Sequence, residues 1–381
     1  MASGWEMRLT ISSPGTRHQP SATVADVTER QLIARIQCTL PPAPGWMLVG
    51  IGDDAAVVEP ERNRVEVLTV DALVEGVHFD RAFVPPDAIG YRALAVNLSD
   101  LAAMGASPRA ALLSLALPGG LPLGDFDGMI HGLAHLAAEH RLHLAGGNVT
   151  RSPGPLMIDV TAIGTVKRRQ ALTRGGARPG DDLYVSGTIG AAAAGLAMLR
   201  ERQKLSTAED TKDTEGQPDA RWVPTFVSSV SSVVKSCLDR YLYPEPRVRL
   251  GVLLSRNRAA TACVDLSDGL TDGVRRLVEA SGVGAAIDAD AVPVHPGARA
   301  WFNGAGRDGV AEAMTLGDDY ELLLAARPRT GRRLAEAMRR SGTPLTRIGT
   351  CTKDPAILLS CDVDGRRVER ALPEAAYHHF R

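Results

Sequence analysis

The chain has 381 residues, enough for about two domains that each bury a hydrophobic core. Its 43 Lys and Arg residues nearly balance 44 Asp and Glu residues, so the formal net charge of −1 lacks the basic field typical of nucleic-acid-binding proteins. No apolar run approaches the roughly 18 residues of a membrane-spanning helix, and residues 1–20 lack the apolar segment of a secretion signal. The five cysteines contain no C-x-x-C pair. We therefore expect a cytoplasmic protein with no nucleic-acid or membrane partner.

The first half of the chain alternates predicted strands with predicted helices. Residues 1–27, rich in Ser, Thr and Pro, predict a flexible leader, and the first helix signal follows from residue 28. Beyond it the pattern predicts strands at 64–70, 110–117 and 156–166, and helices at 90–104 and 126–140. This alternation predicts an α/β or mixed α+β layer within an N-terminal domain of residues 28–167.

A second block begins after residues 168–180, where Arg, Gly and Pro cluster and where we place the domain boundary. A predicted helix at 191–200 is followed by residues 201–236, which are polar and then rich in Ser and Val, and which predict an insertion. The pattern then resumes, with strands predicted at 261–265, 284–288, 321–325 and 357–359. The C-terminal domain is therefore predicted to span residues 168–381.

Aspartates recur where an apolar run meets a turn. They fall in five places: Asp53 with Asp54, Asp71, Asp100, the group Asp265, Asp268 and Asp272, and Asp318 with Asp319. Mg²⁺ commonly takes one or two carboxylates together with phosphate oxygens and water, so turns that converge from distant segments could hold several ions on a polyphosphate. Any single Asp in such a turn is more often a turn or cap residue. Their recurrence in one chain favours a magnesium and phosphate site.

Several familiar nucleotide-binding and hydrolase motifs are absent from the sequence. No Gly-Lys dipeptide occurs, which excludes a Walker A loop, and no G-x-G-x-x-G opens a predicted helix. The motifs His-Arg-Asp, H-E-x-x-H and G-x-S-x-G are missing as well. We interpret His131 and His135, one helical turn apart, as part of a solvated helix face. Arg174, in a Gly-rich segment, suits either a phosphate contact or a loop salt bridge.

Eight motifs follow one another in a recognisable order: GIGDDAA (50–56), TVDALVEGVHF (69–79), ALAVNLSDLAAMGASP (93–108), AGGNVTR (145–151), ALTRGGARPGD (171–181), YPEPR (243–247), DLSDGL (265–270) and GDDYELL (317–323). This series resembles that of the thiamine-monophosphate kinase family, within the aminoimidazole-ribonucleotide-synthetase superfamily. The resemblance runs from about residue 28 to residue 380, apart from 201–236. NLSDLAAMGA and DLSDGL are specific to the superfamily, whereas the forms TVDALVEGVHF and GDDYELL point to the thiamine branch.

The resemblance implies an activity and a fold. The family transfers a phosphoryl group from ATP directly to thiamine monophosphate, by in-line attack with several Mg²⁺ ions, and yields thiamine diphosphate. Its N-terminal α/β domain forms a β-barrel across a homodimer and is joined to a C-terminal α/β domain. We therefore expect ATP and thiamine monophosphate as substrates, Mg²⁺ as cofactor, and a homodimer. Phosphoryl transfer depends on positioning and charge neutralisation, which agrees with the acidic turns.

The resemblance also implies roles for individual residues. The catalytic carboxylates would be Asp71, Asp100 and Asp265. Ligands to Mg²⁺ would come from Asp54, Thr69, Val70, Asp71, Asp100, Asn148, Asp265 and Asp268. Contacts to ATP fall at Gly147, Asn148, Arg174 and Ser267, and contacts to thiamine monophosphate fall at His78, Asp318 and Tyr377.

Three positions depart from the family pattern. Asn148 replaces an Asp, so its amide oxygen can bind Mg²⁺ but brings no negative charge. Val70 replaces a Thr and lacks the hydroxyl, although its backbone carbonyl could still bind a metal ion. Asp318 replaces a Glu and carries its carboxylate on a shorter side chain. These departures bear on metal affinity and on substrate placement.

Two alternatives remain open at this stage. A superfamily paralogue would use ATP on another substrate, as an amidine-forming or a selenophosphate-type synthetase does. No Cys lies in a Gly-rich N-terminal loop, where a selenophosphate enzyme is expected to carry its nucleophile. A nucleotide-binding regulator that lost catalysis through Asn148 and Val70 would bind ATP without turnover.

Overall fold

The computed structural model describes residues 22–210, 232–363 and 365–374. Residues 1–21 of the predicted leader and the centre of the predicted insertion lie outside this part of the chain. The described end of the leader forms a short 3₁₀ helix, η1 (Val24–Asp26), and the backbone N–H of Val24 donates to the carbonyl of Leu121. The last residues of the leader are therefore fixed against the N-terminal domain.

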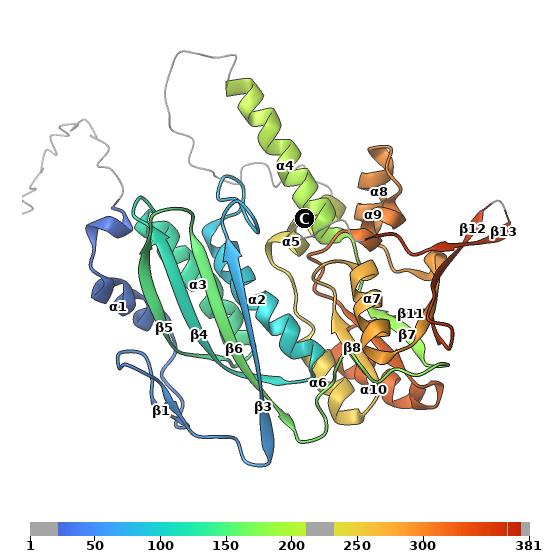
Figure 1. Ribbon diagram of the computed structural model, residues 1–381. Helices are drawn as coiled ribbons and strands as arrows, with labels where there is room; N and C mark the ends of the chain where they lie inside the picture. Colours follow the sequence, from blue (N-terminus) through green and yellow to red (C-terminus); the bar gives the residue numbers. More distant parts are fainter. Residues whose placement is uncertain (1–21, 211–231, 364, 375–381) are drawn as a thin grey trace, which may run out of the picture.

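The N-terminal domain is a four-stranded sheet with helices on one face. Its strands are β3 (Arg64–Val74), β4 (Ser107–Pro118), β5 (His143–Ser152) and β6 (Met157–Lys167), in the order β3-β6-β4-β5. The pair β4–β5 is parallel and the other two pairs are antiparallel. Helices α2 (Pro86–Ala103) and α3 (Leu123–Glu139) cover one face, and α1 (Glu29–Thr39) lies beside α3 (Figure 1). A small ribbon of β1 (Met47–Val49) and β2 (Val57–Val58) completes the domain.

Among the described residues, no helix covers the other face of this sheet, which we call the open face. Leu68 and Val70 on β3 are 65% and 57% exposed there, and Leu112 and Met157 are each 39% exposed on the neighbouring strands. The four strands form an open sheet, and no sheet closes on itself among the described residues. The barrel implied by the resemblance is therefore not formed within this single chain.

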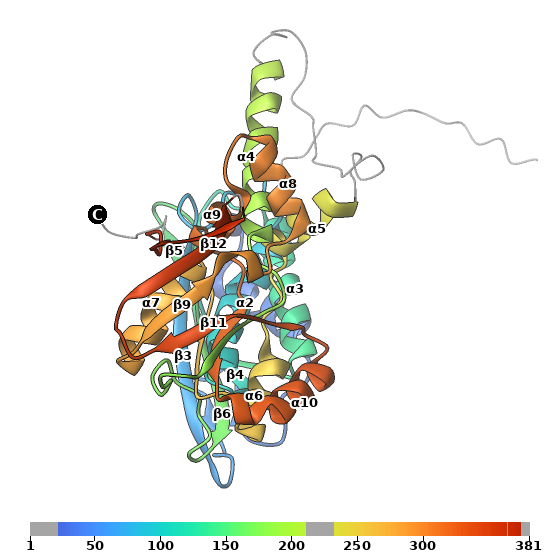
Figure 2. The same cartoon turned by 90° about the vertical axis from the view of Figure 1, so that its right-hand side faces the viewer.

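The C-terminal domain is built on a seven-stranded sheet in the order β13-β12-β9-β11-β7-β10-β8. Its strands are β7 (Asp182–Ser186), β8 (Ala262–Asp265), β9 (Gly284–Asp288), β10 (Leu322–Ala326), β11 (Leu345–Thr352), β12 (Ile357–Val363) and β13 (Arg366–Ala371). Its helices are α4 (Ala191–Asp210), α5 (Ser232–Leu242), α6 (Val248–Asn257), α7 (Leu270–Ser281), α8 (Pro296–Gly304), α9 (Gly309–Thr315) and α10 (Gly331–Ser341). Helix α4 projects beyond both sheets (Figure 1 and Figure 2). Helices α4 and α5 occupy the two ends of segment 201–236, which the sequence had predicted to be an insertion.

The two domains meet along α2. This helix is buried along nearly its whole length and touches β3 and β6 of its own domain as well as α6 and β8 of the other. The contact with α6 is close, because a Cβ built on Gly251 would lie 2.0 Å from the carbonyl oxygen of Ala102. No helix of the described ranges is long and apolar enough to cross a membrane. The polar residues of α2 are thereby placed where both domains can reach them.

Candidate active site

A cluster of carboxylates lies where β3, α2 and β8 meet. Thr69 and Asp71 project from the face of β3 that turns toward α2, and the hydroxyl of Thr69 donates a short hydrogen bond to Asp100 on that helix. The neighbouring Ser99 donates its hydroxyl to Asp265 at the end of β8, at 2.8 Å. Residues from both domains therefore converge on one buried site, as the sequence had predicted for three of its acidic turns.

Burial and neighbouring negative charge raise the pKa of two carboxylates in this cluster. Burial, followed by the nearby charges of Asp100 and Asp265, raises the pKa of Asp71 to about 7. Burial and the charge of Asp100 also raise the pKa of Asp265, against the opposing hydrogen bond from Ser99. Like charges held this close favour a bound cation, because it would stabilise all the ionised carboxylates together.

The donor chemistry of the cluster suits Mg²⁺. Every donor is an oxygen, which is the ligand type that Mg²⁺ prefers. Among the described residues no group of three or more His, Cys, Asp or Glu side chains is arranged to enclose a metal ion. Mg²⁺ does not require such a cage when phosphate and water complete its octahedron, since one or two carboxylates per ion are common. The cluster therefore fits ions that are shared with a phosphate-bearing ligand.

A second group of polar residues lies on the open face of the sheet, and it joins the predicted Asn148 to Asp159 and Ser114, which were not predicted. Asp159, Ser114 and Asn148 stand directly opposite one another on β6, β4 and β5, and so share this face. They line a cavity of about 550 Å³ together with Asp54 and Gly147. Asp71, Asp100 and Asp265 do not line it. The structure thus divides the expected metal and nucleotide residues between the two faces of one sheet.

The geometry of the sheet explains two features of this region, which are the glycine at position 147 and the direction of the Val70 side chain. A Cβ built on Gly147 would lie 1.8 Å from the carbonyl oxygen of Leu113, so only glycine fits there. The side chain of Val70 is on the open face, away from Thr69 and Asp71, because neighbouring strand residues alternate between faces. A role of Val70 in metal binding would consequently fall to its backbone carbonyl alone.

The loop that follows α9 packs against the loop that follows β8. The backbone N–H of Asp318 donates to the carbonyl oxygen of Ser267 at 2.7 Å. The backbone N–H of Tyr320 donates to the carbonyl oxygen of Leu266 at 3.0 Å. Asp318 and Tyr320 have φ values of 70° and 50°, in the left-handed region that few non-glycine residues adopt. This pairing fixes the backbone that presents the Asp318 carboxylate.

Arg92 joins α2 to that loop and was not among the predicted residues. Its side chain is 1% exposed and its Nη2 lies 3.2 Å from Oδ1 of Asp318. The guanidinium also donates to the carbonyl of Tyr241 and lies 4.4 Å from the centroid of that residue's ring. A lone Arg inside the apolar run of α2 was the signal in the sequence, because a buried charge needs a partner.

Comparison with known proteins agrees with this arrangement. Residues 52–166 match the family described as AIR synthase related protein, N-terminal domain, and residues 178–361 match its C-terminal domain. The chain is 32% identical over 343 residues to thiamine-monophosphate kinase of Bacillus subtilis, and the alignment covers 87% of this chain and 94% of that protein. The chain belongs to the thiamine-monophosphate kinase family.

Solved structures of the family resemble the fold. The thiamine-monophosphate kinase of Stenotrophomonas maltophilia is 35% identical, with a TM-score of 0.73 over 92% of this chain and 99% of that chain. A structure of AaThiL complexed with AMPPCP and TMP is 28% identical, with a TM-score of 0.64 over 93% of this chain and 98% of that chain. The two-domain α/β fold expected from the sequence is thereby confirmed.

All but one of the other residues that the kinase family implies lie within the described part of the chain. Asp268 is held by Arg276 at 2.9 Å, which already neutralises its charge. Arg174 lies close enough to lower the pKa of Asp265. His78, in the turn after β3, accepts a hydrogen bond at Nδ1 from the backbone N–H of Val74 at 3.0 Å. Tyr377 lies outside the described residues.

Two further buried carboxylates of the kinase motif GDDYELL were left without a role by the sequence. Glu321 is fully buried and accepts from Arg240 at 2.7 Å, from Arg247 at 2.5 Å and from the hydroxyl of Ser186 at 2.5 Å. Asp319 accepts from the backbone N–H of Gly190 at 2.7 Å, yet burial raises its pKa to about 7. These contacts tie strand β10, which follows the loop that holds Asp318, to α5 and to the YPEPR segment.

The Glu321 contacts predict a large effect on stability. Glu321→Gln should lower the free energy of unfolding by about 3–5 kcal/mol, because it removes the buried countercharge of Arg247, which then keeps only the exposed Glu245 at 2.8 Å. Glu336→Gln is the matched control, since Glu336 pairs with Arg339 on the surface and should cost less than about 1 kcal/mol. Denaturant unfolding of both variants measures the difference. Equal losses in the two variants would contradict a structural role for Glu321.

Proposed function

We propose that this protein transfers the γ-phosphoryl group of ATP to thiamine monophosphate and releases thiamine diphosphate and ADP. The observation that carries the proposal is the convergence of Asp71, Asp100 and Asp265 from two domains on one buried site, in a chain of this family. Family membership and the complex of AaThiL with an ATP analogue and TMP support the choice of substrates. We place the reaction in the cytoplasm.

In this mechanism the protein mainly positions two phosphate-bearing substrates. We assign Asp71, Asp100 and Asp265 as the residues that hold Mg²⁺ near the transferred phosphoryl group, with Thr69 and Ser99 orienting two of these carboxylates. Mg²⁺, when bound, supplies positive charge that stabilises the negative charge of the transferred group. The phosphate of thiamine monophosphate acts as the nucleophile, so the chain needs no covalent residue.

We assign the surrounding residues to the two substrates. Gly147, Asn148, Arg174 and Ser267 would contact ATP, and Asp54, Asn148 and Asp268 would add Mg²⁺ ligands around its phosphates. His78, Asp318 and Tyr377 would contact thiamine monophosphate. Arg92 is a positioning residue in this scheme, since it holds Asp318 from the buried side. The domains would divide these tasks, with residues 28–167 carrying most metal ligands and residues 168–381 closing over the substrates.

Product analysis tests the reaction and the substrate together. With ATP and Mg²⁺, the protein should convert thiamine monophosphate to thiamine diphosphate and should leave free thiamine unchanged. Removal of divalent ions with EDTA should stop turnover, because charge neutralisation dominates this kind of transfer. ATP binding without any thiamine diphosphate would instead favour the regulator interpretation, and Asn148→Asp would then be expected to restore activity.

Loss of one carboxylate should separate activity from stability. Asp71→Asn and Asp100→Asn should each lower kcat at least about 100-fold, as removal of one charge-stabilising group typically does. Asp71→Asn should leave the melting temperature unchanged or raised, because it also removes repulsion inside the cluster. Asp127→Asn is the control, since Asp127 pairs with Arg35 at the surface of α3. Normal turnover of either cluster variant at saturating Mg²⁺ would refute the metal assignment.

We also propose that the apolar part of the open face is covered by a second copy of the chain. Leu68 and Val70 are the most exposed apolar residues of this face, and exposed apolar residues that lie together commonly mark a protein interface. Sedimentation velocity should show a dimer for the wild-type chain. Leu68→Lys with Met157→Lys should give monomers, whereas Met338→Lys, at an exposed site on α10, should not. A monomeric wild-type chain would exclude this interface.

A further inference from the structure

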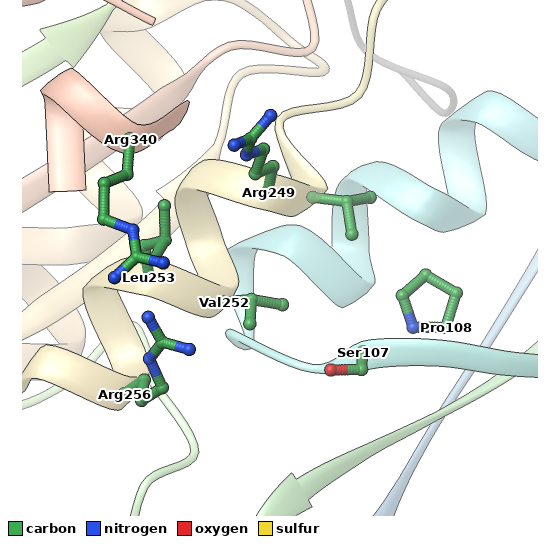
Figure 3. A pocket seen from close by; sticks show the side chains of 8 residues that line it. Ser107, Pro108, Arg249, Val252, Leu253, Arg256 and Arg340 are labelled. Atoms are coloured by element: carbon green, nitrogen blue, oxygen red, sulfur yellow. The ribbon is translucent and has the colours of Figure 1, made fainter. Parts of the chain in front are cut away.

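A second cavity lies apart from the acidic cluster, between α6, α10 and the start of β4. It has a volume of about 290 Å³ and is lined by Ser107, Pro108, Val248, Arg249, Val252, Leu253, Arg256 and Arg340 (Figure 3). None of the residues assigned above to ATP, Mg²⁺ or thiamine monophosphate lines it. The cavity therefore needs an explanation of its own.

The helical repeat explains how α6 builds this cavity. Arg249, Val252, Leu253 and Arg256 are spaced i, i+3, i+4 and i+7, so they share one face of the helix. Gly251, which contacts α2, points in another direction. Arg340 reaches toward this face from α10, and its side chain and that of Arg256 extend toward each other (Figure 3). The result is a concave site with apolar residues between three guanidinium groups.

These guanidinium groups are poorly neutralised by the protein. Within residues 22–210, 232–363 and 365–374, Arg249 and Arg256 have no ion-pair partner. Arg340 lies 3.9 Å from Glu336, which is already paired with Arg339. Like charges that face one another without carboxylates favour the binding of an anion.

The sequence around the cavity strengthens this positive field. Residues 327–340 contain six Arg and a single Glu, and α6 contains two Arg and no acidic residue. The chain as a whole carries a formal charge of −1, so this run of Arg residues departs from the overall charge balance. A local field of this kind attracts phosphate groups in particular, since guanidinium groups bind their oxygens in pairs.

We propose that this cavity binds a small organic phosphate. Its phosphate group would lie between Arg256 and Arg340, with Arg249 adding positive charge, and its apolar body would contact Pro108, Val252 and Leu253. The concave shape and the apolar floor favour a small ligand over the backbone of a nucleic acid, which would follow an extended basic surface. The site is independent of the acidic cluster and of the proposed reaction.

The first experiment measures ligand binding to the full chain in EDTA by calorimetry. Under these conditions the acidic cluster holds no Mg²⁺ to attract phosphate. The probes are phenyl phosphate and inorganic phosphate. Phenyl phosphate should bind more tightly, because only its ring reaches the apolar floor. Equal affinity for the two probes, or no binding of either, would overturn the organic-phosphate assignment.

Matched variants then locate the site. Arg256→Gln with Arg340→Gln should weaken phenyl phosphate binding about tenfold or more, as loss of a charge-assisted hydrogen bond typically does. Arg332→Gln with Arg333→Gln removes the same charge from α10 at residues that do not line the cavity, and should change the affinity less than about twofold. All four arginines are exposed, so the variants should keep the wild-type melting temperature.

Two results would place the anion elsewhere. Equal weakening by both pairs of substitutions would show a diffuse field and would refute a defined pocket. Displacement of phenyl phosphate by a single-stranded RNA oligonucleotide that itself binds more tightly to the wild-type chain would identify a nucleic-acid surface instead. Retention of wild-type affinity by Arg256→Gln with Arg340→Gln would exclude the cavity altogether.

Discussion

Helix α2 is buried along nearly its whole length, and its polar side chains must find partners in two domains. Burial without a partner would cost several kcal/mol for a charge, so each of these side chains dictates what surrounds it. Arg92 meets Asp318, Ser99 meets Asp265, and Asp100 accepts from Thr69. The acidic cluster and the loop that holds Asp318 are thereby held against the same helix, and the proposed reaction depends on that shared support.

Buried charges in this protein fall into two kinds. Glu321 is surrounded by Arg240 and Arg247 and needs nothing further, so we regard it as structural. The charged groups that act on Asp71 are carboxylates. Together with burial, their negative charge raises the pKa of Asp71. A group that the protein leaves unbalanced is a better candidate for ligand binding than one it neutralises. The same reasoning, with the opposite sign, singles out Arg249 and Arg256 on α6.

The sheet of the N-terminal domain separates the expected ligands by the alternation of its strands. Asp71 turns toward α2, whereas Asn148 and Asp159 turn toward the open face. Asp159 nevertheless contributes to the raised pKa of Asp71, so the two groups are electrostatically linked through the sheet.

The sequence by itself determined the α/β class, most strands of the N-terminal sheet and the acidic turns, because periodicity, glycines and strand-end aspartates are local signals. It also determined the family, through the order of eight motifs. Local patterns could not show that the side chains of Thr69 and Val70 lie on opposite faces of one sheet, or that Arg92 meets Asp318. They also missed β5 and β11, whose burial depends on neighbouring strands. Only the tertiary structure decided these points, because partners distant in sequence become neighbours through packing around α2.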